Sequence, residues 1–200
     1  MERGTKYLLG GLGALAAAGA AFFYLRETRA GETAHDVLLK KGRFELRAYP
    51  ALLVAETVQT GDRERATNRG FLKLASYIFA EERAGEPIAM TAPVLTEPTS
   101  DGFSGWKTRF IMPPEWTAET LPAPGAGVEI NDIPARTVAV IRFAGYADDA
   151  LLADKEAELR RWIADNGLKT RGDAEYALYN SPVIPGPLRR TEVLIEVERP

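Results

Sequence analysis

Residues 44–51 read FELRAYPA, and residues 128–135 read VEINDIPA. Both stretches alternate apolar with polar residues and end in a proline followed by an alanine, at an offset of 84 residues. A pattern repeated at a fixed offset indicates two copies of one structural unit. The same offset pairs Val54 with Val138, Ala55 with Ala139 and Gly61 with Gly145.

Each half continues with the same order of patterns. In the first half, a strand bent at Pro50 leads to Asp62, which is suited to cap a helix. Apolar residues then recur at helical spacing, at Phe71, Leu74, Ala75, Ile78 and Phe79. In the second half, a strand over 128–143 bends at Pro134 and a helix runs from Asp148 to Asn166. Further strands are expected near 88–96, 106–112, 175–180 and 191–198.

These patterns predict an α+β fold built from two βαββ halves, residues 43–115 and 127–200. One βαββ unit leaves a sheet face bare, and two copies bury that face against each other. We therefore expect pseudo-two-fold symmetry and a curved, mostly antiparallel, barrel-like sheet with two main helices. A cleft between the halves would be a natural place for a small molecule.

The first thirty residues have a different character. Residues 7–25 are 19 residues without a charge, and a helix of that length spans about 28 Å, close to the ~30 Å hydrocarbon core of a bilayer. We predict that residues 1–30 form a single-pass transmembrane helix, with a cleaved signal segment as the alternative. Residues 31–42 are then a linker, and residues 43–200 are a domain expected on the extracytoplasmic side.

Composition excludes several classes of function. The chain of 200 residues has no cysteine and one histidine, which rules out disulfides, thiolate-bound metals and histidine-rich metal sites. A net charge of −3 gives no electrostatic footprint for nucleic acid. We found no phosphate-binding loop or nucleophile motif. We therefore predict that the protein is not an enzyme.

Several segments resemble one family. They read IAMTAPV at 88–94, RFIMP at 109–113 and LRRTEV at 188–193, and follow a segment that runs from Gly70-Phe71 to Phe79. Their order over residues 36–200 is similar to that of SOUL haem-binding proteins. The resemblance implies the duplicated fold and non-covalent binding of haem or another tetrapyrrole in an apolar groove. By the resemblance, the residues at this groove are Asn68, Phe71, Leu72, Ala75, Ser76, Val183, Ile184, Pro185 and Leu188.

The chain departs from the family at one position of interest. Some members carry a histidine, proposed as an axial iron ligand, where this chain has Ala48. We therefore expect haem to be held without a histidine ligand, by apolar contact and by a cation such as Arg189 on a propionate. Adjacent strand residues point to opposite faces, so at most one of Arg189 and Arg190 faces the groove. Other possible iron ligands, each more plausibly structural, are His35, Met90, Met112, Tyr49, Tyr77, Tyr176 and Tyr179.

The leading hypothesis is thus a membrane-tethered, non-enzymatic protein that binds haem. An effector-binding or scavenging module for another apolar small molecule is one alternative. A less favoured alternative is a tetrapyrrole-modifying enzyme that uses Glu175 or Glu192 as its base.

Overall fold

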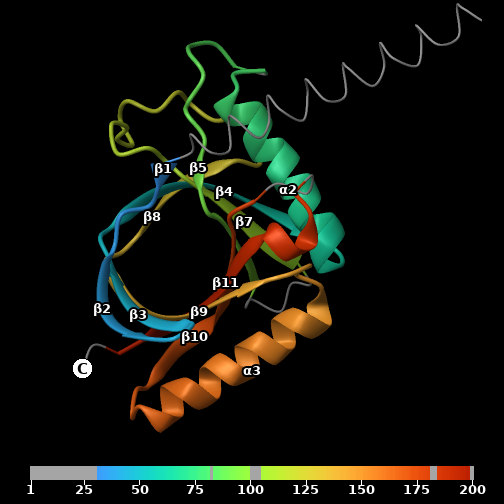
Figure 1. Ribbon diagram of the computed structural model, residues 1–200. Coiled ribbons are helices and arrows are strands. Elements are labelled where there is room, and N and C mark those ends of the chain that lie inside the picture. The colour runs from blue at the N-terminus through green and yellow to red at the C-terminus, as the bar shows by residue number, and fades with distance from the viewer. Residues whose placement is uncertain (1–30, 82, 100–104, 181–183, 199–200) are drawn as a thin grey trace, which may run out of the picture.

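The computed structural model describes residues 31–81, 83–99, 105–180 and 184–198. They form one large sheet, one two-stranded pairing and two main helices (Figure 1). The helices are α2 (Arg63–Ile78), α3 (Asp149–Asp165) and the short 3₁₀ turn η1 (Gly186–Leu188). The strands are β1 (Gly31–Glu32), β2 (Asp36–Lys41), β3 (Phe44–Tyr49), β4 (Leu52–Thr60), β5 (Thr91–Ala92), β6 (Val94–Pro98), β7 (Gly105–Ile111), β8 (Glu129–Ile133), β9 (Arg136–Ala144), β10 (Thr170–Leu178) and β11 (Arg190–Val197).

The main sheet has nine strands in the order β2-β3-β9-β11-β10-β6-β7-β4-β8, and every neighbouring pair is antiparallel. It curves strongly around its concave face (Figure 1). Among the described residues, the edge strands β2 and β8 are not hydrogen-bonded to each other. The predicted α+β class, the two helices and the curved antiparallel sheet are therefore confirmed, but the sheet does not close into a barrel.

The strand order has a regularity that bears on the predicted duplication. If β2 is left aside, the order of the other eight strands is unchanged when β3, β4, β6 and β7 are exchanged for β8, β9, β10 and β11 respectively and the order is read backwards. Two copies of one unit would produce such an order. The duplication and its pseudo-two-fold axis stay predictions, because strand order alone does not give a rotation.

Both main helices begin where the sequence predicts. The Asp62 carboxylate accepts from the Arg65 backbone N–H at 3.0 Å, and the Asp148 carboxylate accepts from that of Leu151 at 2.8 Å. These contacts satisfy backbone donors that the first helical turn leaves free. Helix α2 lies close against β7, because a Cβ atom at Gly70 would stand 2.5 Å from Thr108 Oγ1.

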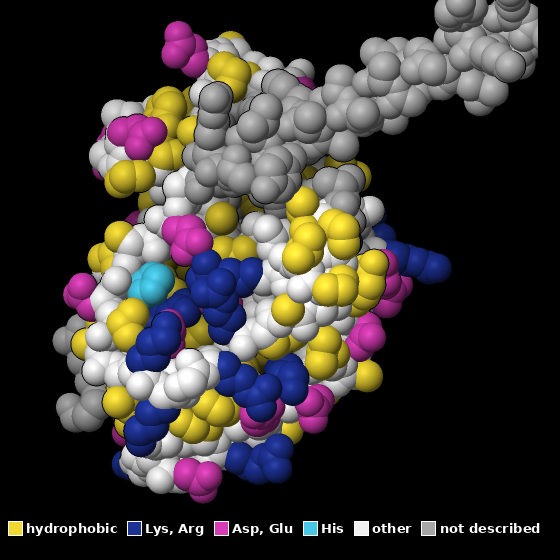
Figure 2. All heavy atoms as spheres, viewed as in Figure 1, with side chains coloured by type: hydrophobic (Ala, Val, Ile, Leu, Met, Phe, Trp, Pro, Cys, Tyr) yellow, Lys and Arg dark blue, Asp and Glu magenta, His cyan; other side chains and the backbone are white. Residues whose placement is uncertain are grey.

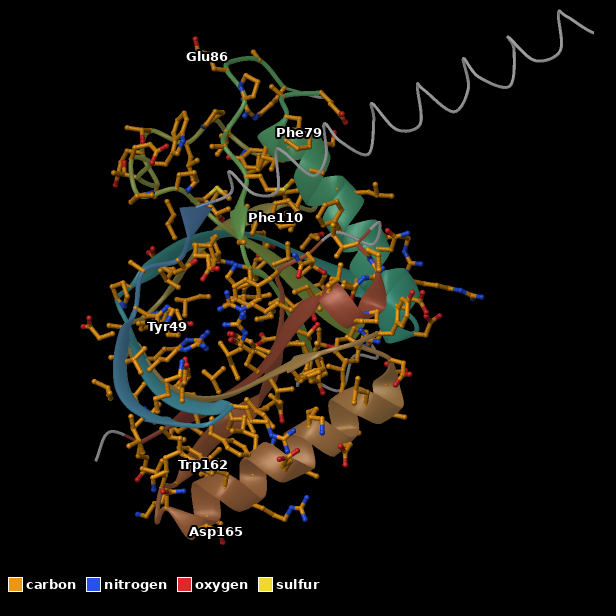
Figure 3. All side chains as sticks on the ribbon, in the orientation of Figure 1. Tyr49, Phe79, Glu86, Phe110, Trp162 and Asp165 are labelled. Atoms are coloured by element: carbon orange, nitrogen blue, oxygen red, sulfur yellow. The ribbon has the colours of Figure 1, made fainter. Side chains whose placement is uncertain are left out.

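The two helices pack against apolar side chains on the convex side of the sheet. Leu74 and Ile78 of α2 are buried with Phe110 of β7, which lies beside α2 in Figure 3. Leu159 and Ile163 of α3 are buried against β9, β10 and β11 in a second cluster. Trp162, also labelled in Figure 3, stacks on Phe44 with ring centroids 5.3 Å apart. The helices therefore cover the convex side, as the periodicity of their apolar residues predicts.

The concave face between the halves differs from the apolar cleft that we expected. Its centre is occupied by the guanidinium of Arg47, whose side chain is 2% exposed. Arg47 donates to both oxygens of Glu192 at 2.7 and 3.1 Å, and to Glu45 at 2.7 Å. Tyr49 and Tyr179 close the same network, and Tyr49 points into the curve of the sheet in Figure 3. Other inward-facing strand positions carry an apolar cluster that includes Val54, Ile111, Val140 and Leu194, so this face combines paired charges with apolar side chains.

The stretch that we predicted as a linker, residues 31–42, differs as well. It contains β1, which pairs with β5, and β2, which pairs with β3. Residues 36–41 form a strand despite their charged composition, because their backbone groups are hydrogen-bonded to β3. Across the described ranges, no helix is long and apolar enough to span a membrane. The predicted anchor falls on residues 1–30, outside the described residues, and stays a prediction.

The Arg47–Glu192 pair yields a test of stability. Changing Glu192 to Gln leaves the Arg47 charge buried without its main partner, which costs about 3–5 kcal/mol. We expect the free energy of unfolding, measured by urea denaturation, to fall by that amount. Glu196→Gln on the same strand is the control, because its partner Arg171 is 70% exposed and the loss should stay below about 1 kcal/mol. Equal effects of the two substitutions would contradict this account.

Candidate functional site

The predicted site residues on α2 lie along the outer part of the helix. Asn68 and Leu72 are exposed, and Leu72 is 60% exposed. Phe71 and Ser76 are half-buried, and the Phe71 ring meets Phe110 edge-on at 5.3 Å. Ala75 is buried in the core beneath the helix. Leu72 and part of Phe71 are therefore accessible on the helix surface, whereas Ala75 is packed beneath them.

The second predicted segment runs through η1. Leu188 is 73% exposed, Pro185 is exposed and Ile184 is half-buried. The Leu188 N–H donates to the Pro185 carbonyl at 2.9 Å and so holds the turn. Val183 lies outside the described residues.

The turn between β9 and α3 connects the two segments. The Arg63 side chain at the start of α2 donates to the Ala147 carbonyl at 2.5 Å. On the other side of the turn, the Gly145 N–H donates to the Gly186 carbonyl at 3.1 Å. Figure 2 shows hydrophobic side chains gathered on the surface over α2 and η1. We call the exposed apolar part of these two segments, which includes Leu72 and Leu188, the α2–η1 surface.

This surface is not a deep pocket. The structure forms two adjoining hollows of about 460 Å³ each, and none of the predicted site residues lines either of them. They are lined by Ile133, Pro134, Ala135, Arg136, Thr137, Arg171, Gly172, Glu196, Val197 and Glu198. A ligand of the α2–η1 surface would therefore lie on it rather than inside the protein.

The two adjacent arginines contact different groups, and only Arg190 belongs to β11. Arg189 Nε donates to the Ile184 carbonyl at 2.7 Å, and its guanidinium lies 4.9 Å from the centre of the Tyr146 ring. Arg190 pairs with Glu192 at 2.9 Å and with Glu32 at 2.6 Å. Arg189 is therefore the cation that borders the α2–η1 surface.

The other side chains considered as iron ligands lie elsewhere. Met112 is buried and Met90 packs against the same core cluster, while the His35 ring lies tilted at 39° to that of Tyr49 with ring centroids 4.9 Å apart. Burial raises the pKa of all four tyrosines considered, that of Tyr176 to about 12, which disfavours a phenolate. Their hydroxyls are bonded to Arg47 (Tyr49), the Pro122 carbonyl (Tyr77), Glu156 (Tyr176) and Glu192 (Tyr179).

Glu175 and Glu192, the two candidate bases, are both committed to arginines. Glu175 is 5% exposed and accepts from Arg136 at 2.5 Å and Arg109 at 3.1 Å. Burial alone would raise the pKa of each carboxyl, but the neighbouring guanidinium groups outweigh it and hold both pKa values below the ordinary value. A paired carboxylate with a lowered pKa is a weak base. In the part of the chain that the structure describes, no group of three His, Cys, Asp or Glu residues is arranged to hold a metal ion.

The curved antiparallel sheet with two helices belongs to a family that sequence comparison identifies. The family model SOUL heme-binding protein matches residues 31–196, and the chain belongs to this family. It is 32% identical over 163 residues to Heme-binding protein 2 of Homo sapiens, covering 78% of this chain and 80% of that protein.

Solved structures share the fold at low sequence identity. The EcmrR C-terminal domain superposes with a TM-score of 0.57 at 17% identity, covering 78% of this chain and 98% of that chain. A protein described as a hydrolase from Listeria innocua gives a TM-score of 0.56 at 13% identity, covering 80% and 94%. At such identities the likeness shows the fold alone.

Sequence reasoning missed Tyr146 and the hollows near Arg136. Tyr146 is 62% exposed and lies in the turn between the two site segments. Helical and strand periodicity do not cover turns, so no periodic signal could have found it. Its place directly before the Asp148 helix cap was the only local sign.

The lowered pKa values of Glu175 and Glu192 predict how stability depends on pH. Each group is ionised in the folded state at a pH where the unfolded carboxyl, near 4.5, is already protonated. Their stabilisation is therefore complete above that pH and is lost as the pH falls through the lower folded-state values. We expect the melting temperature to be level at about pH 6–8 and to fall progressively below about 4.5. A level melting temperature down to about pH 3 would contradict this.

Proposed function

We propose that this protein binds haem or another tetrapyrrole non-covalently on the α2–η1 surface, without a histidine axial ligand and without catalysing a reaction. The observation that carries the proposal is the exposure of Leu72 and Leu188 on two elements that the fold holds together. The family relationship of the chain supports haem as the class of ligand, because the human relative is named Heme-binding protein 2.

The residues present fit such a ligand. A tetrapyrrole is a large flat apolar plate, and covering apolar surface contributes about 25 cal/mol per Å². Leu72, Leu188 and the exposed edge of Phe71 supply apolar surface. Arg189 at the border supplies a charge for a propionate carboxylate. Binding of this kind depends on contact area and on one charge, and it requires no bond to iron.

The proposal extends to the place of the protein in the cell. Residues 1–30 would anchor the chain in a membrane as a single helix, with the domain of residues 43–200 on the extracytoplasmic side. The length of the uncharged stretch at 7–25 supports this part. Protease protection of the full chain in membranes would test it.

Haemin titration of the full chain tests the binding site. We expect a Soret shift at micromolar haemin, and Leu72→Glu and Leu188→Glu should each weaken binding at least about tenfold, because each places a charge against an apolar ligand. Val58→Glu is the control, since Val58 is 44% exposed and belongs to β4, not to α2 or η1. The proposal is wrong if the wild type gives no Soret shift, or if both site variants bind like the control.

Metal-free protoporphyrin tests the part of the proposal that concerns iron. If apolar contact and the Arg189 charge hold the ligand, protoporphyrin IX should bind within about tenfold of haemin. Quenching of porphyrin fluorescence measures this affinity. Loss of affinity by a factor of about a thousand would instead indicate an axial iron ligand.

A further inference from the structure

Tyr146 combines exposure with a fixed position. Its side chain is 62% exposed, yet it is packed so closely on Gly186 that an added Cβ atom there would stand 2.4 Å from its Cε2. The Arg189 guanidinium lies 4.9 Å from the centre of the ring. The backbone of the turn is held too, since the Asp148 N–H donates to the Tyr146 carbonyl at 2.9 Å.

The residues on either side of Tyr146 are bound to α2 and to η1. The next residue, Ala147, is bound by Arg63 of α2, and the preceding residue, Gly145, is bound to Gly186 of η1. Tyr146, Leu72 and Leu188 are three of the exposed large hydrophobic side chains among the described residues. Figure 2 shows hydrophobic side chains on the surface in the region of α2 and η1.

The other described tyrosines behave differently. The hydroxyls of Tyr49, Tyr77, Tyr176 and Tyr179 are each bonded to a protein partner, and none of these four side chains is exposed. These four side chains pack in the core or take part in the charge network. A tyrosine that is held rigidly at the surface presents a large contact area and loses little conformational freedom when a ligand binds.

We propose that the Tyr146 ring is a contact surface for the ligand and makes the site selective for a flat conjugated molecule. Aromatic rings pack best against other flat π-systems, so such a ligand gains more from Tyr146 than from an aliphatic side chain of equal area. Gly186 is the positioning residue, because its missing side chain lets the ring lie against η1. This inference rests on the proposed function. It adds Tyr146 to Leu72 and Leu188 as a third contact for the ligand, which neither the family resemblance nor the periodicity indicated.

Three variants of the full chain, titrated with haemin, test the inference. Tyr146→Phe keeps the ring and should bind within about twofold of wild type. Tyr146→Leu keeps apolar area but removes the flat ring, and should weaken binding about 5–10-fold. Val58→Leu is the control for an exposed apolar change outside the surface and should have no effect. Thermal melting of each variant checks that the fold is retained.

Gly186→Ala tests the positioning role through coupling. The added methyl group displaces the Tyr146 ring, so haemin binding should weaken severalfold in the wild-type background. In the Tyr146→Leu background the same substitution should have little further effect, because the ring it displaces is gone. Additive losses would overturn the positioning role.

The outcomes separate this inference from the proposed function. If Leu72→Glu loses haemin while Tyr146→Leu binds like wild type, the inference is wrong and the proposed site stands. If Tyr146→Phe loses as much affinity as Tyr146→Leu, the hydroxyl matters and the ring-contact inference is wrong. If the wild type does not bind haemin, both fail together.

Discussion

The structure depends on the buried ion pair between Arg47 and Glu192, whose side chains are 2% and 0% exposed. It links β3 to β11 across the concave face, from positions 145 residues apart in the chain. Two charges removed from water are tolerated only where geometry and further hydrogen bonds compensate them. Glu45, Tyr49 and Tyr179 provide that compensation.

The surface that we propose for binding lies on the outside of the sheet. There α2 and α3 cover separate areas, and the turn at Tyr146 joins them to η1. Leu72 and Leu188 stay exposed because the helices and η1 bury the residues beneath them instead. An exposed apolar surface that the fold maintains in this way is typical of an interaction site. The family relationship indicates which ligand that surface takes.

Much of the fold could be predicted from the sequence because its signals are local. Asp62 and Asp148 mark the two helix starts within a single turn, and the spacing of Leu74, Ala75 and Ile78 gives the buried face. The strand at residues 36–41 could not be predicted, since its charged and apolar residues show no alternation and only pairing with β3 makes it a strand. Of the candidate site, both segments were found through the family resemblance, while Tyr146 lay in a turn.

By itself, the sequence determined the two main helices with their caps, the strands from residue 44 onward and the family, because each of these follows from neighbouring residues. Only the tertiary structure decided which way Arg189 and Arg190 point and what fills the concave face. Alternation along a strand says that adjacent residues face opposite sides, but it does not say which side is which. That choice is made by partners such as Glu192 and Tyr146, whose positions are known only once the chain has folded.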